Sequence, residues 1–319
     1  MQHYLISITG PTAIGKTGLS IKLAMALNTE ILSADSRQFY KEMSIGTAVP
    51  TQEELNLVPH HFIQHLSIKD SYDVGDFEKD ALTTLDSLFA RHSSLLMVGG
   101  SGLYLKAVCE GLNYFPEVNP KIREDLNRQY KAEGIGKLQS RLKQLDPDYA
   151  SRVDLQNHRR LIRALEICIG SGKTYSYFLN QPKTPRPFKS LKIGLTAPRE
   201  FIYERINQRV DKMMEKGLLE EAKRLFPLRQ YPALNTIGYQ EIFAHLEGRC
   251  SLDFAVSEIK KNTRRFAKRQ LTWFKKDPAI HWFPHDTPSS TVITYIQQKK
   301  NSPYSSSLGS STTNRKPSP

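Results

Sequence analysis

The chain has 319 residues, 39% hydrophobic and 24% charged, which is enough apolar material for one or two globular domains and excludes a wholly disordered chain. Its formal net charge of +13 favours a polyanionic partner, and a soluble protein that happens to be basic is the alternative. The three widely spaced cysteines, Cys109, Cys168 and Cys250, argue against a disulfide framework and a cysteine-rich zinc site. With no secretory signal and no apolar run long enough for a membrane span, we expect a cytoplasmic protein.

Short apolar runs that alternate with helical patterns predict a parallel sheet. The predicted strands cover residues 4–9, 30–34, 95–98, 191–196 and 280–283, and the long helical patterns cover residues 16–27, about 199–226 and about 253–275. This alternation favours an α/β fold in which helices flank a parallel sheet. His60 and His61 follow Pro59 without partners at a metal-binding spacing, so we expect them in a loop.

The middle of the chain differs from both ends in composition. Residues 120–170 are charged and helical in period, and a proline-rich stretch at 181–187 leads back to a predicted strand. We therefore expect a core formed by residues 1–114 and 190–285, with a mainly helical insertion at 115–189. The Ser/Pro-rich residues 300–319 are almost without apolar side chains and are expected to be disordered.

Residues 10–17 match the phosphate-loop pattern G-x-x-x-x-G-K-S/T between a predicted strand and a predicted helix. The loop consists of Gly10, Pro11, Thr12, Ala13, Ile14, Gly15, Lys16 and Thr17. Its glycines let backbone N–H groups point at phosphate oxygens, while Lys16 is expected to reach the terminal phosphate and Thr17 to ligate Mg²⁺. The pattern indicates a polyphosphate: ATP is the usual ligand, and a small organic diphosphate would meet the same donors.

Two other segments follow predicted strands at the same edge of the sheet. Asp35 follows the second strand, and Gly99-Gly100-Ser101-Gly102 follows the third. Because ligands of open parallel sheets bind beyond the carboxyl ends of the strands, we expect Thr17, Asp35 and Ser101 to face one crevice. Asp35 is a candidate Mg²⁺ ligand through water or a general base, and the alternative is a cap of the next turn. The glycines suit either close approach of a bulky ligand or a tight turn.

Three basic clusters on predicted helices are candidate contacts for a polyanion. Residues 255–276 contain eight Lys or Arg residues against one Glu, and we expect Phe266 to pack on the apolar face of that helix. The other two clusters are Arg159, Arg160 and Arg163, and Arg205, Arg209 and Lys212. A solvated charged face is the alternative for each cluster.

Taken in chain order, the motifs closely resemble those of the bacterial tRNA dimethylallyltransferase family, also called the tRNA isopentenyltransferase or IPP transferase family. The motifs are residues 10–17, 35–40, 45–48, 60–61, 72–77, 99–104, 157–166, 209–221 and 237–241. The likeness runs from about residue 5 to residue 283. The chain differs from the family pattern at Ser101, where Thr is usual, and at Val49, where Lys is common.

The resemblance implies a P-loop fold and transfer of a dimethylallyl group from dimethylallyl diphosphate. The implied acceptor is N6 of the adenosine that lies 3′ of the anticodon, in tRNAs reading codons that begin with U. It implies Mg²⁺ as cofactor and residues 10–17 as the diphosphate site. The implied catalytic residues are Asp35 as general base, Lys16, Thr17 and Arg209. The implied tRNA contacts are Asp35, Ser36, Arg37, Gln38, Ser101, Arg123, Arg159, Arg160 and Arg163.

The insertion resembles the family's helical domain that holds the anticodon stem-loop, and we expect a monomer. Two alternatives stay open from the residues alone. One is a P-loop small-molecule kinase or free-nucleotide prenyltransferase, against which the basic clusters argue. The other is an RNA-stimulated NTPase without transferase chemistry.

Overall fold

The structure is a computed structural model, and it describes residues 2–301. The chain divides into two compact units, Met1–Cys109 with Pro187–Pro319 (the sheet unit) and Glu110–Arg186 (the helical unit). Most of the tail expected to be disordered, residues 302–319, lies outside the described residues. Its first two residues, Lys300 and Asn301, end helix α14 (Ser289–Asn301).

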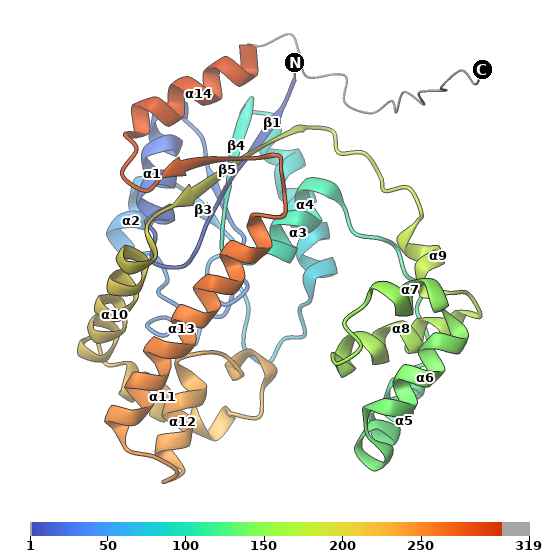
Figure 1. The fold of residues 1–319 in the computed structure, drawn as a ribbon. Helices are drawn as coiled ribbons and strands as arrows, with labels where there is room; N and C mark the ends of the chain where they lie inside the picture. Colours follow the sequence, from blue (N-terminus) through green and yellow to red (C-terminus); the bar gives the residue numbers. More distant parts are fainter. Residues whose placement is uncertain (1, 302–319) are drawn as a thin grey trace, which may run out of the picture. The chain divides into compact units, whose positions relative to one another are not determined.

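Within the described part of the chain, the sheet unit contains one six-stranded sheet in the order β3-β2-β4-β1-β5-β6 (Figure 1). The strands are β1 (Tyr4–Thr9), β2 (Ile31–Ser33), β3 (His60–His61), β4 (Ser94–Val98), β5 (Lys189–Thr196) and β6 (Ile280–Pro284). Every neighbouring pair is parallel. The predicted α/β fold with a parallel sheet flanked by helices is therefore confirmed.

Alternate residues of the central strands enter two separate cores, as the two-residue period of a strand requires. Leu5 of β1 lies in a core with side chains of α3 and α4, whereas Ile6 and Ile8 lie in a core with α1, α10 and α14. Helices thus cover both faces of the sheet (Figure 1). The helices of this unit are α1 (Lys16–Leu27), α2 (Gln52–Leu57), α3 (Val74–Phe89), α4 (Gly102–Glu110), α10 (Arg199–Glu215), α11 (Leu218–Leu225), α12 (Tyr239–Leu246), α13 (Leu252–Phe274) and α14, with short 3-10 turns at Phe226–Leu228 and Pro232–Leu234.

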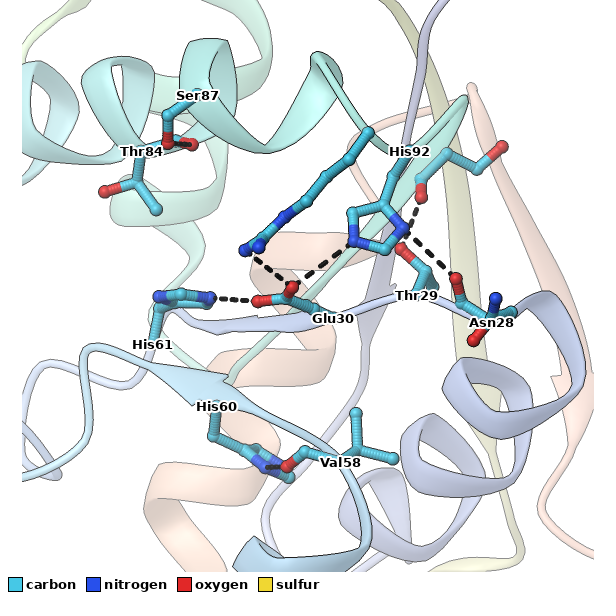
Figure 2. A network of polar contacts seen from close by, with 11 residues as sticks. Asn28, Thr29, Glu30, Val58, His60, His61, Thr84, Ser87 and His92 are labelled. Carbon is cyan, nitrogen blue, oxygen red and sulfur yellow. Dashed lines mark hydrogen bonds and ion pairs between the residues drawn. The ribbon is translucent and has the colours of Figure 1, made fainter.

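Two local expectations are wrong. The single helical pattern at about 199–226 forms two helices, because Gly217 adopts a left-handed backbone with φ 94° between α10 and α11. His60 and His61 do not lie in a loop but form edge strand β3 beside β2. Figure 2 shows why the pair is held there: His61 Nε2 lies 2.7 Å from Glu30 Oε2, and His60 Nδ1 lies 2.7 Å from the Val58 carbonyl oxygen.

The helical unit has its own small core. Its helices are α5 (Pro120–Glu133), α6 (Ile135–Leu145), α7 (Pro147–Arg152), α8 (His158–Ser171) and α9 (Tyr175–Leu179). Leucines of α5, α6 and α8 form the core, including the fully buried Leu138, Leu142 and Leu161. The buried Asp146 carboxylate accepts hydrogen bonds from the Ser176 amide and hydroxyl at 2.7 and 2.8 Å. A carboxylate with these partners fixes α9 against the α6–α7 turn.

Among residues 2–301, no helix combines the length and apolar character needed to cross a membrane.

Candidate active site

The phosphate loop connects β1 to the N-terminus of α1 in a conformation that requires its glycines. Gly10 has φ +143°, and a Cβ there would lie 2.8 Å from the Leu195 carbonyl oxygen. Gly15, with φ +105°, precedes the first turn of α1, and Ala13 takes φ 65° between them. The loop and helix therefore present backbone N–H groups and a partial positive charge where an anion would bind.

Lys16 lies inside this loop. Its Nζ donates hydrogen bonds to the carbonyl oxygens of Gly10 and Pro11 at 3.0 and 2.8 Å. Burial lowers the pKa of Lys16 to about 8; the Asp35 carboxylate opposes this shift, and the Arg209 guanidinium adds to it. Lys16 is therefore mostly protonated at neutral pH, and an incoming polyphosphate would favour the charged form further.

Two arginines of α10 reach the same loop. Arg209 Nη1 donates to the Thr12 hydroxyl at 3.2 Å, and Arg205 Nε donates to the Ala13 carbonyl oxygen at 2.8 Å. Burial lowers the pKa of Arg209, while Asp35 opposes that shift. Because a guanidinium stays charged at neutral pH, Arg209 brings a second positive charge beside Lys16.

Asp35 follows β2 at the same edge of the sheet. Its Oδ1 accepts a hydrogen bond from the Arg37 amide at 3.1 Å. The carboxylate therefore caps the next turn, which is the alternative role expected for it from the sequence. Ser101 Oγ accepts from the Ser36 amide at 3.2 Å. These contacts hold the segment after β2 against the segment after β4.

One cavity of about 1380 Å³ within the sheet unit brings most of the expected site residues together. The expected residues that line it are Thr12, Ala13, Gly15, Lys16, Thr17, Asp35, Ser36, Arg37, Gln38, Ser101 and Arg209. Gly10, Pro11 and Ile14 do not line it, and Ile14 is buried in the core under α1. Val49 is on the wall as well, so its difference from the family pattern lies inside the site.

Phe266 departs from its expected position. It is 37% exposed and lines the cavity with Arg269 and Trp273 of the same helix, α13, instead of packing in the core. The basic face of α13 is also partly paired with α10. Lys260 Nζ lies 2.6 Å from Asp211 Oδ1, and Arg264 Nη1 donates to Asn207 Oδ1 at 2.8 Å.

The four arginines expected to contact tRNA from the insertion lie in the helical unit. Arg123 and Arg163 both reach the buried Glu166 carboxylate, at 2.9 and 3.1 Å. Arg159 and Arg160 are exposed at the start of α8. The cluster therefore consists of two arginines held in place by a shared carboxylate and two that point into solvent.

Two polar residues that organise the cavity wall are not among the predicted site residues, although Glu221 ends the motif at 209–221. Glu221 is 3% exposed, and its carboxylate accepts from the amides of Ser44, Ile45 and Gly46 at 2.9–3.1 Å. Gln270 is 6% exposed and bonds both the phosphate loop and the glycine segment 99–102. Both occur in charged helical stretches, where no local pattern distinguishes a buried polar side chain from a solvated one.

The donor atoms around the phosphate loop fit Mg²⁺ better than a softer metal. Thr17 and Asp35 line the same cavity and offer a hydroxyl and a carboxylate, the oxygen ligands that Mg²⁺ prefers. Among the described residues there is no cluster of three or more His, Cys, Asp or Glu side chains that could hold a metal. A Mg²⁺ ion bound by few protein ligands together with substrate phosphates and water needs no such cluster.

Comparison with known proteins supports the resemblance drawn from the motifs. A family model described as "IPP transferase" matches residues 38–277. A curated tRNA dimethylallyltransferase from Christiangramia forsetii is 59% identical over 301 residues, 94% of this chain and 100% of the relative; one from Flavobacterium johnsoniae is 53% identical over 299 residues, 92% of this chain and 97% of the relative.

Solved structures agree. The tRNA isopentenylpyrophosphate transferase of Bacillus halodurans superposes with TM-score 0.69 at 37% identity, covering 94% of this chain and 96% of that one. A eukaryotic dimethylallyltransferase described as acting on tRNA superposes with TM-score 0.81 at 25% identity, covering 94% of this chain and 80% of that one.

Proposed function

Because the chain belongs to the IPP transferase family, we propose that it transfers the dimethylallyl group of dimethylallyl diphosphate to tRNA. The acceptor is N6 of the adenosine 3′ of the anticodon in tRNAs reading codons that begin with U. One observation carries this proposal: the phosphate loop and Asp35 line the same cavity. The site for the leaving diphosphate and the group that accepts the proton therefore face the same space.

The donor side of the cavity is built for a diphosphate. The N-terminus of α1, Lys16 and Arg209 supply partial and full positive charges to its oxygens. An adenine N6 amine is a weak nucleophile because its lone pair is delocalised into the ring, so the allylic C1–O bond must weaken early. Charges positioned where the departing diphosphate develops its negative charge stabilise that transition state.

On the acceptor side, Asp35 takes the proton. As N6 bonds to C1, the C1–O electron pair leaves with the diphosphate, and the N6 proton moves to the Asp35 carboxylate. The Arg37 amide holds one carboxylate oxygen in place at 3.1 Å. Thr17 and, through water, Asp35 would hold Mg²⁺, which supplies charge neutralisation to the diphosphate when bound.

The tRNA partner explains the charge of the chain. A net charge of +13 and the arginines of α8 in the helical unit suit the phosphates of an RNA stem-loop. We assign the helical unit, expected at 115–189 and observed at 110–186, to the anticodon stem-loop. Chemistry on a base within a structured RNA requires the base to leave its stack, and a cavity of this size can receive it. We also propose that the enzyme acts in the cytoplasm, in keeping with a tRNA substrate, and that it acts as a monomer.

Neither of the two alternative functions considered from the sequence accounts for the family membership. A small-molecule kinase, a free-nucleotide prenyltransferase or an RNA-stimulated NTPase would not be expected to match this family model across residues 38–277.

The acceptor atom is tested with tRNA transcripts. A transcript that reads a codon beginning with U is compared with one in which the adenosine 3′ of the anticodon is replaced by guanosine. With labelled dimethylallyl diphosphate, the first transcript should become labelled and the second should not. Equal labelling of both transcripts would contradict the assigned acceptor.

A further inference from the structure

The side chain of Gln270 on α13 joins two loops that both line the cavity, the phosphate loop after β1 and the glycine segment after β4. Its Oε1 accepts a hydrogen bond from the Thr12 amide at 2.9 Å, and its Nε2 donates to the Gly100 carbonyl oxygen at 2.9 Å. A backbone N–H only donates and a carbonyl oxygen only accepts, so these two partners fix which way the amide points. Gln270 is 6% exposed, and such a buried amide is costly unless its hydrogen bonds are made.

Two glycines of segment 99–102, Gly100 and Gly102, lie directly against side chains of this helix. A Cβ on Gly100 would lie 2.3 Å from Gln270 Nε2, and a Cβ on Gly102 would lie 2.2 Å from Trp273 Nε1. A Cβ on Gly99 would lie 2.3 Å from the Ala34 carbonyl oxygen. Neighbouring protein atoms fill the space beside each of these glycines. Close packing of the protein therefore explains the glycines without a bulky ligand.

The two loops joined by Gln270 belong to opposite halves of the proposed reaction. Thr12 lies in the diphosphate loop, and its hydroxyl accepts from Arg209. Gly100 precedes Ser101, whose hydroxyl accepts from the Ser36 amide next to Asp35. A continuous path of hydrogen bonds and short backbone links thus runs from the leaving-group site through Gln270 to the segment that carries the base.

We propose that Gln270 is a positioning residue that fixes the separation between the diphosphate loop and the Asp35 segment. This inference rests on the proposed function and deepens it. Attack by N6 and departure of diphosphate occur on opposite sides of the same carbon, so the two loops must be held at a set distance. A shift of about 1 Å in such an arrangement can lower the rate by about 100-fold.

The first test replaces Gln270 with Met, which keeps the length of the side chain and removes both hydrogen bonds. Active-site-titrated, single-turnover transfer to tRNA should slow by about 10- to 100-fold. The dissociation constant for inorganic pyrophosphate should change by less than about threefold, since the diphosphate donors remain in place. The matched control is Gln298→Met on the exposed face of α14, where the rate constant should equal that of the wild type.

A rate constant measured in a single turnover does not depend on the fraction of folded protein, so it separates positioning from mere stability. A Q270M enzyme with the wild-type rate constant would overturn the inference. A wild-type enzyme that transfers no dimethylallyl group would instead overturn the proposed function. The two failures are therefore distinguishable.

The second test uses the contact between Gly100 and Gln270. Among the described residues, and leaving aside its two chain neighbours, a Cβ on Gly100 would meet only atoms of Gln270 within 4 Å. Gly100→Ala should therefore slow transfer about as much as Q270M, by displacing the amide, and should add little in a Gln270→Ala background. Additive effects of the two substitutions on the single-turnover rate constant would contradict the proposal.

Discussion

The Tyr239 hydroxyl donates a hydrogen bond to the Glu221 carboxylate at 2.7 Å, deep in the sheet unit. Burial raises the pKa of Tyr239, and the Glu221 charge raises it further, so the phenol stays protonated as a donor. The same carboxylate accepts three amides of residues 44–46, and the Tyr239 ring lies so close to Gly46 that a Cβ there would be 2.6 Å away. Helices α11 and α12 thereby hold a wall segment of the cavity.

Replacing Glu221 with Gln should destabilise the protein. A glutamine amide cannot accept all four hydrogen bonds, and its own N–H groups would face other donors in a buried place. We expect the free energy of unfolding, measured in urea, to fall by about 1–3 kcal/mol. Glu220→Gln is the control, because Glu220 is exposed and pairs with Lys223 on the surface. Equal unfolding midpoints for the two variants would contradict the role given to Glu221.

Asp35→Asn should separate chemistry from binding. The amide keeps an oxygen for the Arg37 N–H but cannot take the N6 proton. Single-turnover transfer should fall by about 10²–10⁴-fold while the dissociation constant for tRNA changes little. Asp86→Asn on the exposed face of α3 is the control. Loss of tRNA binding with a normal rate at saturating tRNA would refute the base role.

Lys16 should make donor binding depend on pH on the alkaline side. Its pKa is about 8, so in the free enzyme the Lys16 side chain is protonated below that pH and loses its charge above it. Binding of inorganic pyrophosphate above this pKa must take up a proton, so affinity should fall by up to about tenfold per pH unit. The control is Lys16→Arg, whose side chain stays charged over this pH range. Protonation of pyrophosphate itself affects both proteins equally, so it cancels in the ratio of the wild-type association constant to that of the variant. A ratio that stays constant across the pKa would contradict the assignment.

The Glu30 cluster in Figure 2 should make stability sensitive to acid. Burial of Glu30 acts in the opposite direction, but hydrogen bonds with His61 and His92 and the charge of Arg91 lower the pKa of Glu30 below its ordinary value. A lowered pKa contributes stability above the ordinary carboxylate pKa of about 4.3, and this is lost as pH falls through the folded-state value.

We therefore expect Glu30→Gln to flatten the acid limb of a plot of unfolding free energy against pH. The surface substitution Glu124→Gln should leave the limb unchanged, since Glu124 is exposed on α5. Parallel acid limbs for wild type and Glu30→Gln would show that the cluster does not stabilise the native state in this way.

Arg159 and Arg163 should contribute to the salt dependence of tRNA binding. Each phosphate contact removed lowers the slope of log affinity against log salt by about 0.7–0.9. Arg159→Gln and Arg163→Gln are therefore each expected to weaken binding and to reduce the slope by about that amount. Arg128→Gln, an exposed arginine of α5 that pairs with Asp125, should leave the slope as it is. An unchanged slope in the first two variants would remove them from the interface.

The central strands and the phosphate loop could be predicted because their signals are local. Strand β1 is an apolar run buried on both faces, and the glycines of its loop occupy backbone conformations that other residues avoid. The edge strand β3 could not be predicted, because two histidines carry no strand pattern. They pair with β2, and His61 is fixed by Glu30.

The buried polar residues of the cavity wall, Gln270 and Glu221, could not be predicted from the sequence for a different reason. Gln270 meets partners 258 and 170 residues away in the sequence, and Glu221 meets amides 175 to 177 residues away. Within their own helices, both residues resemble the surface positions beside them. Only the fold shows that their hydrogen bonds are made inside the protein.

A choice of donors tests the proposed reaction most directly. Purified protein, Mg²⁺ and unmodified tRNA are incubated with dimethylallyl diphosphate or, separately, with ATP, and the nucleosides are analysed by mass spectrometry. N6-dimethylallyladenosine is expected with the prenyl donor alone. Unmodified adenosine, together with ATP hydrolysis that RNA stimulates, would contradict the proposed reaction and identify the phosphate loop as the site of an RNA-linked NTPase.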